Sequence, residues 1–325
     1  MPESYGTFGN VVAAYSIPGF SRRKLLLGAA AALATVKAAT FSRGMQIHLS
    51  CGALGIKATQ REAIDYAAKY GFDVVDADGN YLAGLSDADM SSLLDYMKSK
   101  NVGWAMAGLP VDFRHDDPMF FDTLRVFSSY VRRLQRAGVT RVTTWLSPAS
   151  KQLPYVKNFR LHAQRLRDAA AALHDGGIRL GIEYVAPKTA WASQKFPFIH
   201  TMAELKELIA EINKPNVGLV LDSWHWYNAG DTKDDLLSLR AADVVSVDLN
   251  DAPAGIPVDQ QVDNKRELPA ATGVIDATGF LGSLEKIGFT GPVRAEPFNE
   301  AVRRMPPDQA LSTTMAAMKK AFGAA

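Results

Sequence analysis

The chain has 325 residues, of which 47% are hydrophobic and 22% are charged, a composition typical of a globular protein with a sizeable core. Its 36 basic and 34 acidic residues leave a net charge of +2, which favours neither a nucleic-acid-binding stripe nor a polybasic membrane patch. The single cysteine, Cys51, excludes an intramolecular disulfide, and we expect it to pack as a small buried group rather than to act as a nucleophile.

The first forty residues differ from the rest of the chain. Ser21, Arg22, Arg23 and Lys24 precede a short apolar run that ends near Val36. Paired arginines before such a run are typical of a twin-arginine export signal, and the run is shorter than the ~20 residues of a spanning helix. We therefore predict a signal region over residues 1–39. The mature protein would be periplasmic or secreted, without stable membrane association. The alternative is an N-terminal helix of a cytoplasmic protein.

From Met45 onward, short apolar runs rich in β-forming residues alternate with stretches of helical period. The expected strands are 46–50, 73–76, 102–107, 141–145, 179–184, 217–222, 244–248 and 293–297. The expected helices are 59–70, 119–137, 160–174, 202–212 and 310–322.

Eight such strands joined by helices predict a parallel α/β sheet, because parallel strands need a crossover between them. Gly71, Gly138, Gly177 and Gly288 fall just after helical stretches, as C-terminal helix caps do. We predict one (β/α)8 TIM barrel over residues 45–323, since such barrels reach about 250 residues as a single domain.

Carboxylates stand at the ends of four consecutive strands. They are Glu183, Asp222, Asp248 and Glu296, which follow strands five to eight. The carboxyl ends of barrel strands meet at one mouth, where four such groups would repel one another unless a cation or protons neutralised them. Oxygen ligands of this kind suit one Mg²⁺, Mn²⁺ or Co²⁺ better than a structural Zn²⁺. The alternative is a set of rim salt bridges or helix caps.

The segments "GIEYV", "VGLVLDSWHW" and "VRAEPFN" resemble the xylose isomerase-like family, which includes ketose 3-epimerases, inosose isomerases, dehydroshikimate dehydratases and endonuclease IV. The resemblance covers roughly residues 45–322. It implies that Glu183, Asp222 and Glu296 bind one divalent metal and that His225 contacts the substrate. It also implies that the two glutamates are catalytic and move a proton next to a carbonyl through an enediolate.

One position departs from the family pattern. Many members carry a histidine ligand on strand seven, where this chain has Asp248. Asp248 either ligates the metal, which gives an all-carboxylate site, or it pairs with Arg266 or Lys265 and leaves three ligands.

Four further residues are candidates for substrate binding. Trp145 ends strand four and is placed to stack on a sugar ring, although barrel tryptophans also fill space. Arg114 follows strand three and would bind a substrate oxygen or cap the next helix. His48 lies on strand one, as a substrate contact or as a core histidine. Arg266 lies in a long segment, residues 250–275, of the length that is usually functional in compact domains.

These observations favour a metal-dependent isomerase or epimerase of a small sugar. A lyase or hydratase acting on an oxidised sugar, such as a 3-keto-glycoside, is the first alternative, because the same proton abstraction starts an elimination. A non-catalytic sugar-binding barrel is the second, although it would predict loss of one of the three implied ligands. A DNA-repair role and a nucleic-acid partner are disfavoured, because the chain has only six histidines. A homo-oligomer is compatible with the sequence.

Overall fold

The computed structural model describes residues 44–323, all of which belong to one unit of the chain. The predicted signal region, residues 1–39, lies outside the described residues.

One parallel sheet forms the centre of this unit, with strand order β3-β2-β1-β11-β10-β9-β7-β5-β4. The strands are β1 (Gln46–Leu49), β2 (Val74–Val75), β3 (Gly103–Trp104), β4 (Ala107–Gly108), β5 (Arg141–Trp145), β7 (Arg179–Glu183), β9 (Val217–Asp222), β10 (Val244–Leu249) and β11 (Pro292–Ala295).

The two ends of this sheet, β3 and β4, are halves of one strand. Gly103 pairs with Val74 of β2, whereas Ala107 pairs with Val142 of β5. The sheet therefore closes on itself through residues 103–108. Because β3 and β4 together occupy one strand position, the nine strands fill the eight strand positions of a (β/α)8 barrel, as predicted. The sequence predicts one continuous strand here. The structure divides it because its first half follows one neighbour and its second half follows the other.

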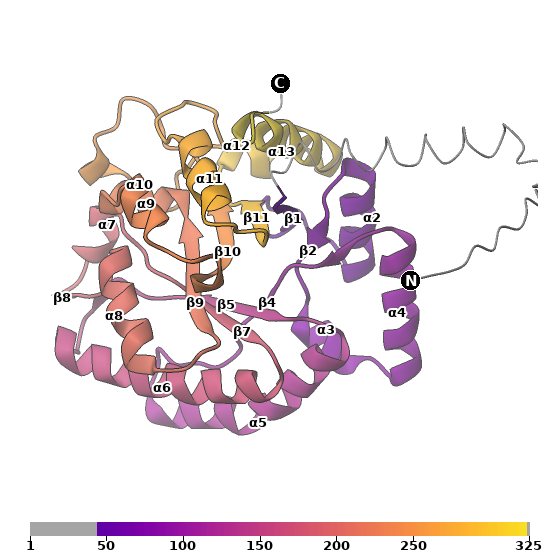
Figure 1. Cartoon of the computed structure of the whole chain (residues 1–325), viewed down its shortest axis with the longest axis horizontal. Coiled ribbons are helices and arrows are strands. Elements are labelled where there is room, and N and C mark those ends of the chain that lie inside the picture. Colours follow the sequence, from indigo (N-terminus) through magenta and orange to yellow (C-terminus); the bar gives the residue numbers. More distant parts are fainter. Residues whose placement is uncertain (1–43, 324–325) are drawn as a thin grey trace, which may run out of the picture. The chain divides into compact units, whose positions relative to one another are not determined.

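Helices surround the strands (Figure 1). The longer ones are α2 (Gln60–Tyr70), α4 (Asp87–Ser99), α5 (Asp117–Arg136), α6 (Tyr155–Asp175), α8 (Met202–Ile212), α11 (Ala277–Lys286) and α13 (Pro307–Ala321). The shorter ones are α3 (Gly79–Gly84), α7 (Lys188–Trp191), α9 (Ser223–Ala229), α10 (Lys233–Leu237), α12 (Glu300–Arg303) and the 3-10 turns η1 (Ala241–Asp243) and η2 (Val258–Gln260). β6 (Ala149–Ser150) and β8 (Phe196–Pro197) form a small antiparallel pair. Within residues 44–323, every helix is too short or too polar to cross a bilayer.

Local sequence signals explain where these helices begin and end. Thr59 caps α2 through a capping box with Glu62, and Gly71 ends it in a left-handed conformation with φ of 82°. The five predicted helices are all present. α6 starts at Tyr155, earlier than the periodicity predicts, because Pro154 stands at its N-cap. α4 and α11 are additional.

Strand register brings four polar residues onto one row inside the barrel. His48 aligns with Arg294, Arg294 aligns with Asp248, and Asp248 aligns with Asp222. Aligned residues of neighbouring parallel strands point to the same side of the sheet. Glu296 stands two residues beyond Arg294, and it therefore continues the inward face of the same strand.

Candidate active site

A cavity of about 510 Å³ opens at the carboxyl ends of the strands. Six of the nine predicted site residues line it: Trp145, Glu183, His225, Asp248, Arg266 and Glu296. A cavity of this size suits a small molecule such as a sugar.

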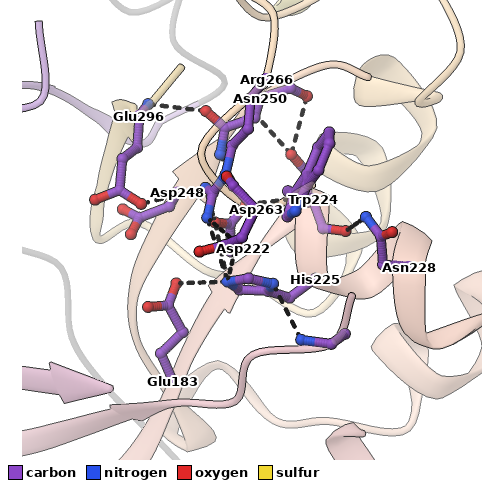
Figure 2. A network of polar contacts seen from close by, with 12 residues as sticks. Glu183, Asp222, Trp224, His225, Asn228, Asp248, Asn250, Asp263, Arg266 and Glu296 are labelled. Carbon is purple, nitrogen blue, oxygen red and sulfur yellow. Dashed lines mark hydrogen bonds and ion pairs between the residues drawn. The ribbon is translucent and has the colours of Figure 1, made fainter. Parts of the chain in front are cut away.

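Four carboxylates converge in the cavity, as Figure 2 shows for Glu183, Asp222, Asp248 and Glu296. One oxygen of each lies within 4.8 Å of one oxygen of every other. Three come from strands β7, β9 and β10, and Glu296 follows β11 directly. The structure thus brings together all four carboxylates that the sequence placed at one mouth.

Glu183 is the least satisfied of the four. Its side chain is 12% exposed, and its Oε1 is buried without a hydrogen-bond partner among the described residues. Burial raises the pKa of Glu183 well above its usual value, and the charges of Glu296, Asp248 and Asp222 raise it further. A buried carboxylate oxygen without a donor is poised to accept a proton or a cation.

Asp222 is fully buried and well bonded. Its Oδ1 accepts hydrogen bonds from the backbone N–H of Trp224 and from Asn250 Nδ2, both at 2.8 Å. Its Oδ2 accepts one from Arg266 Nη1 at 2.6 Å. The Trp224 bond also caps α9, so the carboxylate and the following helix fix each other. Burial raises the pKa of Asp222 despite these donors.

Asp248 pairs with Arg294 and not with Arg266 or Lys265, the two partners that the sequence suggested. Arg294 donates from Nε and Nη2 to the two oxygens of Asp248 at 2.7 and 2.8 Å. Nη2 also donates to Glu296 Oε1 at 2.7 Å. The suggested pairing is wrong because Arg294 stands in direct register with Asp248 on the neighbouring strand, whereas Arg266 is turned to Asp222.

Glu296 lies between two arginines. Its Oε1 accepts from Arg294, and its Oε2 accepts from Arg266 Nη1 at 3.2 Å. Burial raises the pKa of Glu296 to about 7, although the two guanidinium groups oppose this rise. A carboxyl group with this pKa changes its protonation state near neutral pH, as a proton-transfer group should.

His225 faces the carboxylates from the first turn of α9. The backbone N–H of Ala186 donates to its Nδ1 at 3.3 Å, and Arg266 Nη2 lies 3.4 Å from its Nε2, so donor groups approach both ring nitrogens. Nε2 lies 3.8 Å from Asp222 Oδ2 and 3.9 Å from Glu183 Oε1 (Figure 2). Burial lowers the pKa of His225 to about 3, so the ring is neutral at physiological pH. A neutral ring has one N–H and one acceptor nitrogen, and Nε2 is the nitrogen that faces the carboxylates.

Arg266 enters the site from the long segment between β10 and α11. Its guanidinium group is 1% exposed and donates to Asp263 as well as to Asp222 and Glu296. It also lies over the ring of Phe298, 4.6 Å from the centroid. The predicted candidate Arg266 is therefore fixed among the carboxylates, where it balances part of their charge.

Asp251 closes this long segment at its base. Its fully buried carboxylate accepts the backbone N–H groups of Ala252, Thr272, Gly273 and Ile275 at 2.7–2.9 Å. Asp251 and Glu267 also exchange two backbone hydrogen bonds. These contacts of Asp251 hold the two ends of the segment together, and this closure positions Arg266, which is adjacent to Glu267.

The remaining three predictions fall at different depths. Trp145 is 50% exposed at the cavity rim, and the Arg114 guanidinium lies 4.4 Å from its ring centroid. Arg114 donates to Thr144 Oγ1, which places it behind the rim. His48 is enclosed, and its Nε2 lies 2.8 Å from Asp76 Oδ1. The sequence left two alternatives for His48, a substrate contact or a core histidine. The structure buries His48 and pairs it with Asp76, as expected of a core histidine, although its partner in register, Arg294, lines the cavity.

Three site residues were not predicted from the sequence: Asn250, Asp263 and Arg294. Strand alternation contained a signal for two of them, because Asn250 is two residues beyond Asp248 and Arg294 is two residues before Glu296. Asp263 lies in the long loop, where no strand or helix period applies, and its position three residues before Arg266, to which it is bonded, was its only signal.

Comparison with known proteins agrees with this fold and site. The model of the family described as xylose isomerase-like TIM barrel matches residues 64–321. The match covers most of the chain, and the protein belongs to this family.

The relatives that it matches are enzymes. An inosose isomerase of Bacillus velezensis is 20% identical over 262 residues, which are 78% of this chain and 88% of the relative. An inosose isomerase of Bacillus subtilis is 28% identical over 143 residues, 42% of this chain and 46% of the relative. A 3-dehydroshikimate dehydratase of Pseudomonas aeruginosa is 29% identical over 147 residues, 45% of this chain and 22% of the relative. The chain thus spans less than half of the last two proteins.

Solved structures share the fold. A xylose isomerase domain protein from Alicyclobacillus acidocaldarius superposes with a TM-score of 0.74 at 29% identity, covering 86% of this chain and 99% of that one. The IOLI protein with a bound zinc atom superposes with a TM-score of 0.72 at 18% identity, covering 86% and 98%.

Proposed function

We propose that the protein is a divalent-metal-dependent isomerase or epimerase of a small keto sugar or polyol. The observation that carries this proposal is the pair Glu183 and Glu296, two buried carboxyl groups with raised pKa values that face one cavity. Groups of this kind are suited to take a proton from carbon and to return it. The inosose isomerase relatives support the reaction class.

The side chains fit a divalent cation. Four carboxylates and the two guanidinium groups of Arg266 and Arg294 leave two negative charges uncompensated when all are ionised, and Asp263, which also pairs with Arg266, adds a third. Glu183 Oε1 has no donor among the described residues, and oxygen-only ligands suit Mn²⁺, Mg²⁺ or Co²⁺. We propose Glu183, Asp222 and Glu296 as ligands. When bound, the cation polarises the substrate carbonyl and stabilises the negative charge that develops there.

The other steps belong to the chain itself. Glu183 and Glu296 reach the cavity from strands that β9 and β10 separate, so they can act on different sides of one substrate carbon. His225 Nε2 forms a hydrogen bond with a substrate hydroxyl and fixes its orientation. Trp145 provides an apolar face at the rim, where a sugar ring stacks. Arg114 packs against the Trp145 ring and holds the indole in place.

Proton NMR in D2O tests this proposal. Residues 40–325, loaded with Mn²⁺, are incubated with a panel of inososes, keto sugars and 3-keto-glycosides. Deuterium next to a carbonyl together with a rearranged sugar supports the isomerase. Absence of exchange with every panel member, by a protein shown to bind Mn²⁺, contradicts it.

A lyase acting on an oxidised sugar is the second candidate. The 3-dehydroshikimate dehydratase relatives favour it, because a dehydratase also begins by taking a proton. In the same experiment, an unsaturated sugar or a released aglycone identifies the lyase. If residues 1–39 direct export, the substrate is a small sugar found outside the cytoplasm.

A further inference from the structure

We propose that Arg294 and Asp248 form one internal charge pair that positions Glu296, so that Asp248 is a counter-ion and not a metal ligand. This inference rests on the proposed metal site. It assigns a role to Arg294, a residue outside the predicted set, and reduces the four-carboxylate ring to three ligands.

The geometry of the pair is the first argument. Arg294 binds Asp248 side-on, with one guanidinium nitrogen on each carboxylate oxygen at 2.7 and 2.8 Å. Asp248 is fully buried. A planar guanidinium group in this arrangement is among the strongest partners of a carboxylate. None of the other three carboxylates has both oxygens held by one arginine within residues 44–323.

The position of the pair in the sheet is the second argument. Asp248 and Arg294 are directly aligned on β10 and β11, so the backbone itself holds them together. The short Asp248 side chain cannot turn to a cation without leaving the guanidinium group. Glu296 is one methylene longer and follows the end of β11, so it can turn toward a cation.

The third argument is the second bond of Arg294 Nη2, which reaches Glu296 Oε1 at 2.7 Å. Asp248 orients Arg294, and Arg294 orients the carboxylate that we propose as ligand and proton-transfer group. The balance of charge also supports Asp248 as a counter-ion. The extra negative charge of Asp248, relative to the neutral histidine of many family members, is cancelled by the positive charge of Arg294.

Two paired variants separate a counter-ion from a ligand. Asp248→Leu with Arg294→Met removes this ion pair, and Asp222→Asn with Arg266→Met removes the other buried pair of the site, with the same change in charge. Calorimetric titration with MnCl₂ gives the dissociation constant of each. The Asp248→Leu change leaves no ligand oxygen at that position, whereas the control keeps an amide oxygen, so both choices work against the expected order.

We expect the Asp248/Arg294 variant to bind Mn²⁺ about tenfold more weakly than the wild type, the usual effect of losing an orienting partner. We expect at least a hundredfold loss in the Asp222/Arg266 variant. Equal losses in both variants would overturn the inference and leave the proposed function standing. Absence of Mn²⁺ binding by the wild type would instead overturn both.

Circular dichroism establishes that each variant is folded. If the leucine and methionine pair does not fold, Asp248→Asn with Arg294→Gln replaces it, because two amides can still bond to each other. Electron paramagnetic resonance of the bound Mn²⁺ tests the ligand set directly. Mn²⁺ bound to the Asp248/Arg294 variant should keep the electron paramagnetic resonance linewidth of the wild type, because the ligand set is unchanged. A changed linewidth would contradict the inference.

Discussion

Asp222 accepts a 2.6 Å hydrogen bond from Arg266, although the two residues lie 44 positions apart and both are buried. Removing one partner of such a pair leaves an uncompensated charge in the protein interior, which costs about 3–5 kcal/mol. Arg266→Met should therefore lower the free energy of unfolding by about that amount in urea titrations without metal. A saturating divalent cation should restore part of the loss, because it supplies charge to the same carboxylates. The same loss with and without Mn²⁺ would contradict this account.

The two glutamates should be individually essential for turnover. Glu183→Gln and Glu296→Gln each keep the shape of the side chain but remove its capacity to exchange a proton. We expect each to lower the rate by about 10²–10⁴-fold while the barrel stays folded. The rate of solvent deuterium incorporation into the active panel substrate measures this effect. Glu207→Gln, an exposed position on α8 outside the cavity lining, is the matched control and should keep its rate.

Metal affinity should increase with pH. Burial raises the pKa of Glu296 to about 7, so below pH 7 a proton competes with the cation for this carboxylate. Affinity for Mn²⁺ should fall by up to about tenfold per pH unit below pH 7 for each proton displaced. Titrations at pH 5.5, 6.5 and 8 measure the slope, and affinity that is independent of pH would contradict the raised pKa.

The same shift makes the stability of the metal-free protein depend on pH. Because the pKa of Glu296 is raised from 4.5 to about 7, the folded state binds more protons than the unfolded chain between these values. The contribution of Glu296 to stability is therefore complete below pH 4.5 and is lost as the pH rises through 7. Saturating Mn²⁺ should raise the Tm more at pH 8 than at pH 5.5. A larger increase at pH 5.5 would reverse the sign.

Asp251 should control the loop that carries Arg266. Asp251→Ala removes the acceptor of four buried backbone N–H groups, and we expect a loss of about 3 kcal/mol in stability. Cleavage within residues 252–272 by a protease should also become faster. Asp259→Ala is the control on the same loop, since its ion pair with Lys188, 3.6 Å long, is exposed and contributes little. Equal protease resistance of both variants would contradict the proposal that Asp251 holds the ends of the loop together.

Export can be tested without the structure. Arg22→Lys combined with Arg23→Lys should trap the precursor inside a cell that has the twin-arginine pathway. Cell fractionation with an antibody to the barrel detects the trapped form. Normal export of the double variant would show that residues 1–39 are not such a signal.

The barrel and its four carboxylates could be predicted from sequence because each depends on local pattern. Apolar runs mark strands, and a polar residue at the end of a strand must lie at the mouth of a barrel. The ion pairs could not be predicted in the same way. The sequence suggested Arg266 or Lys265 as the partner of Asp248, and only the register between β10 and β11 selects Arg294. The pairing of His48 depends likewise on Asp76, which reaches it from the neighbouring strand segment.

The divided third strand has a dynamic consequence. Residues 103–108 make the only link between the two ends of the described sheet, and Val74, Ala105 and Met106 pack there in a small cluster apart from the main core. Amide hydrogens along this link should exchange with solvent sooner than those of β9 and β10. In the strand order, β9, β10 and β11 lie farthest from it. We therefore expect the barrel to open locally at this link more readily than among the strands that carry Asp222 and Asp248.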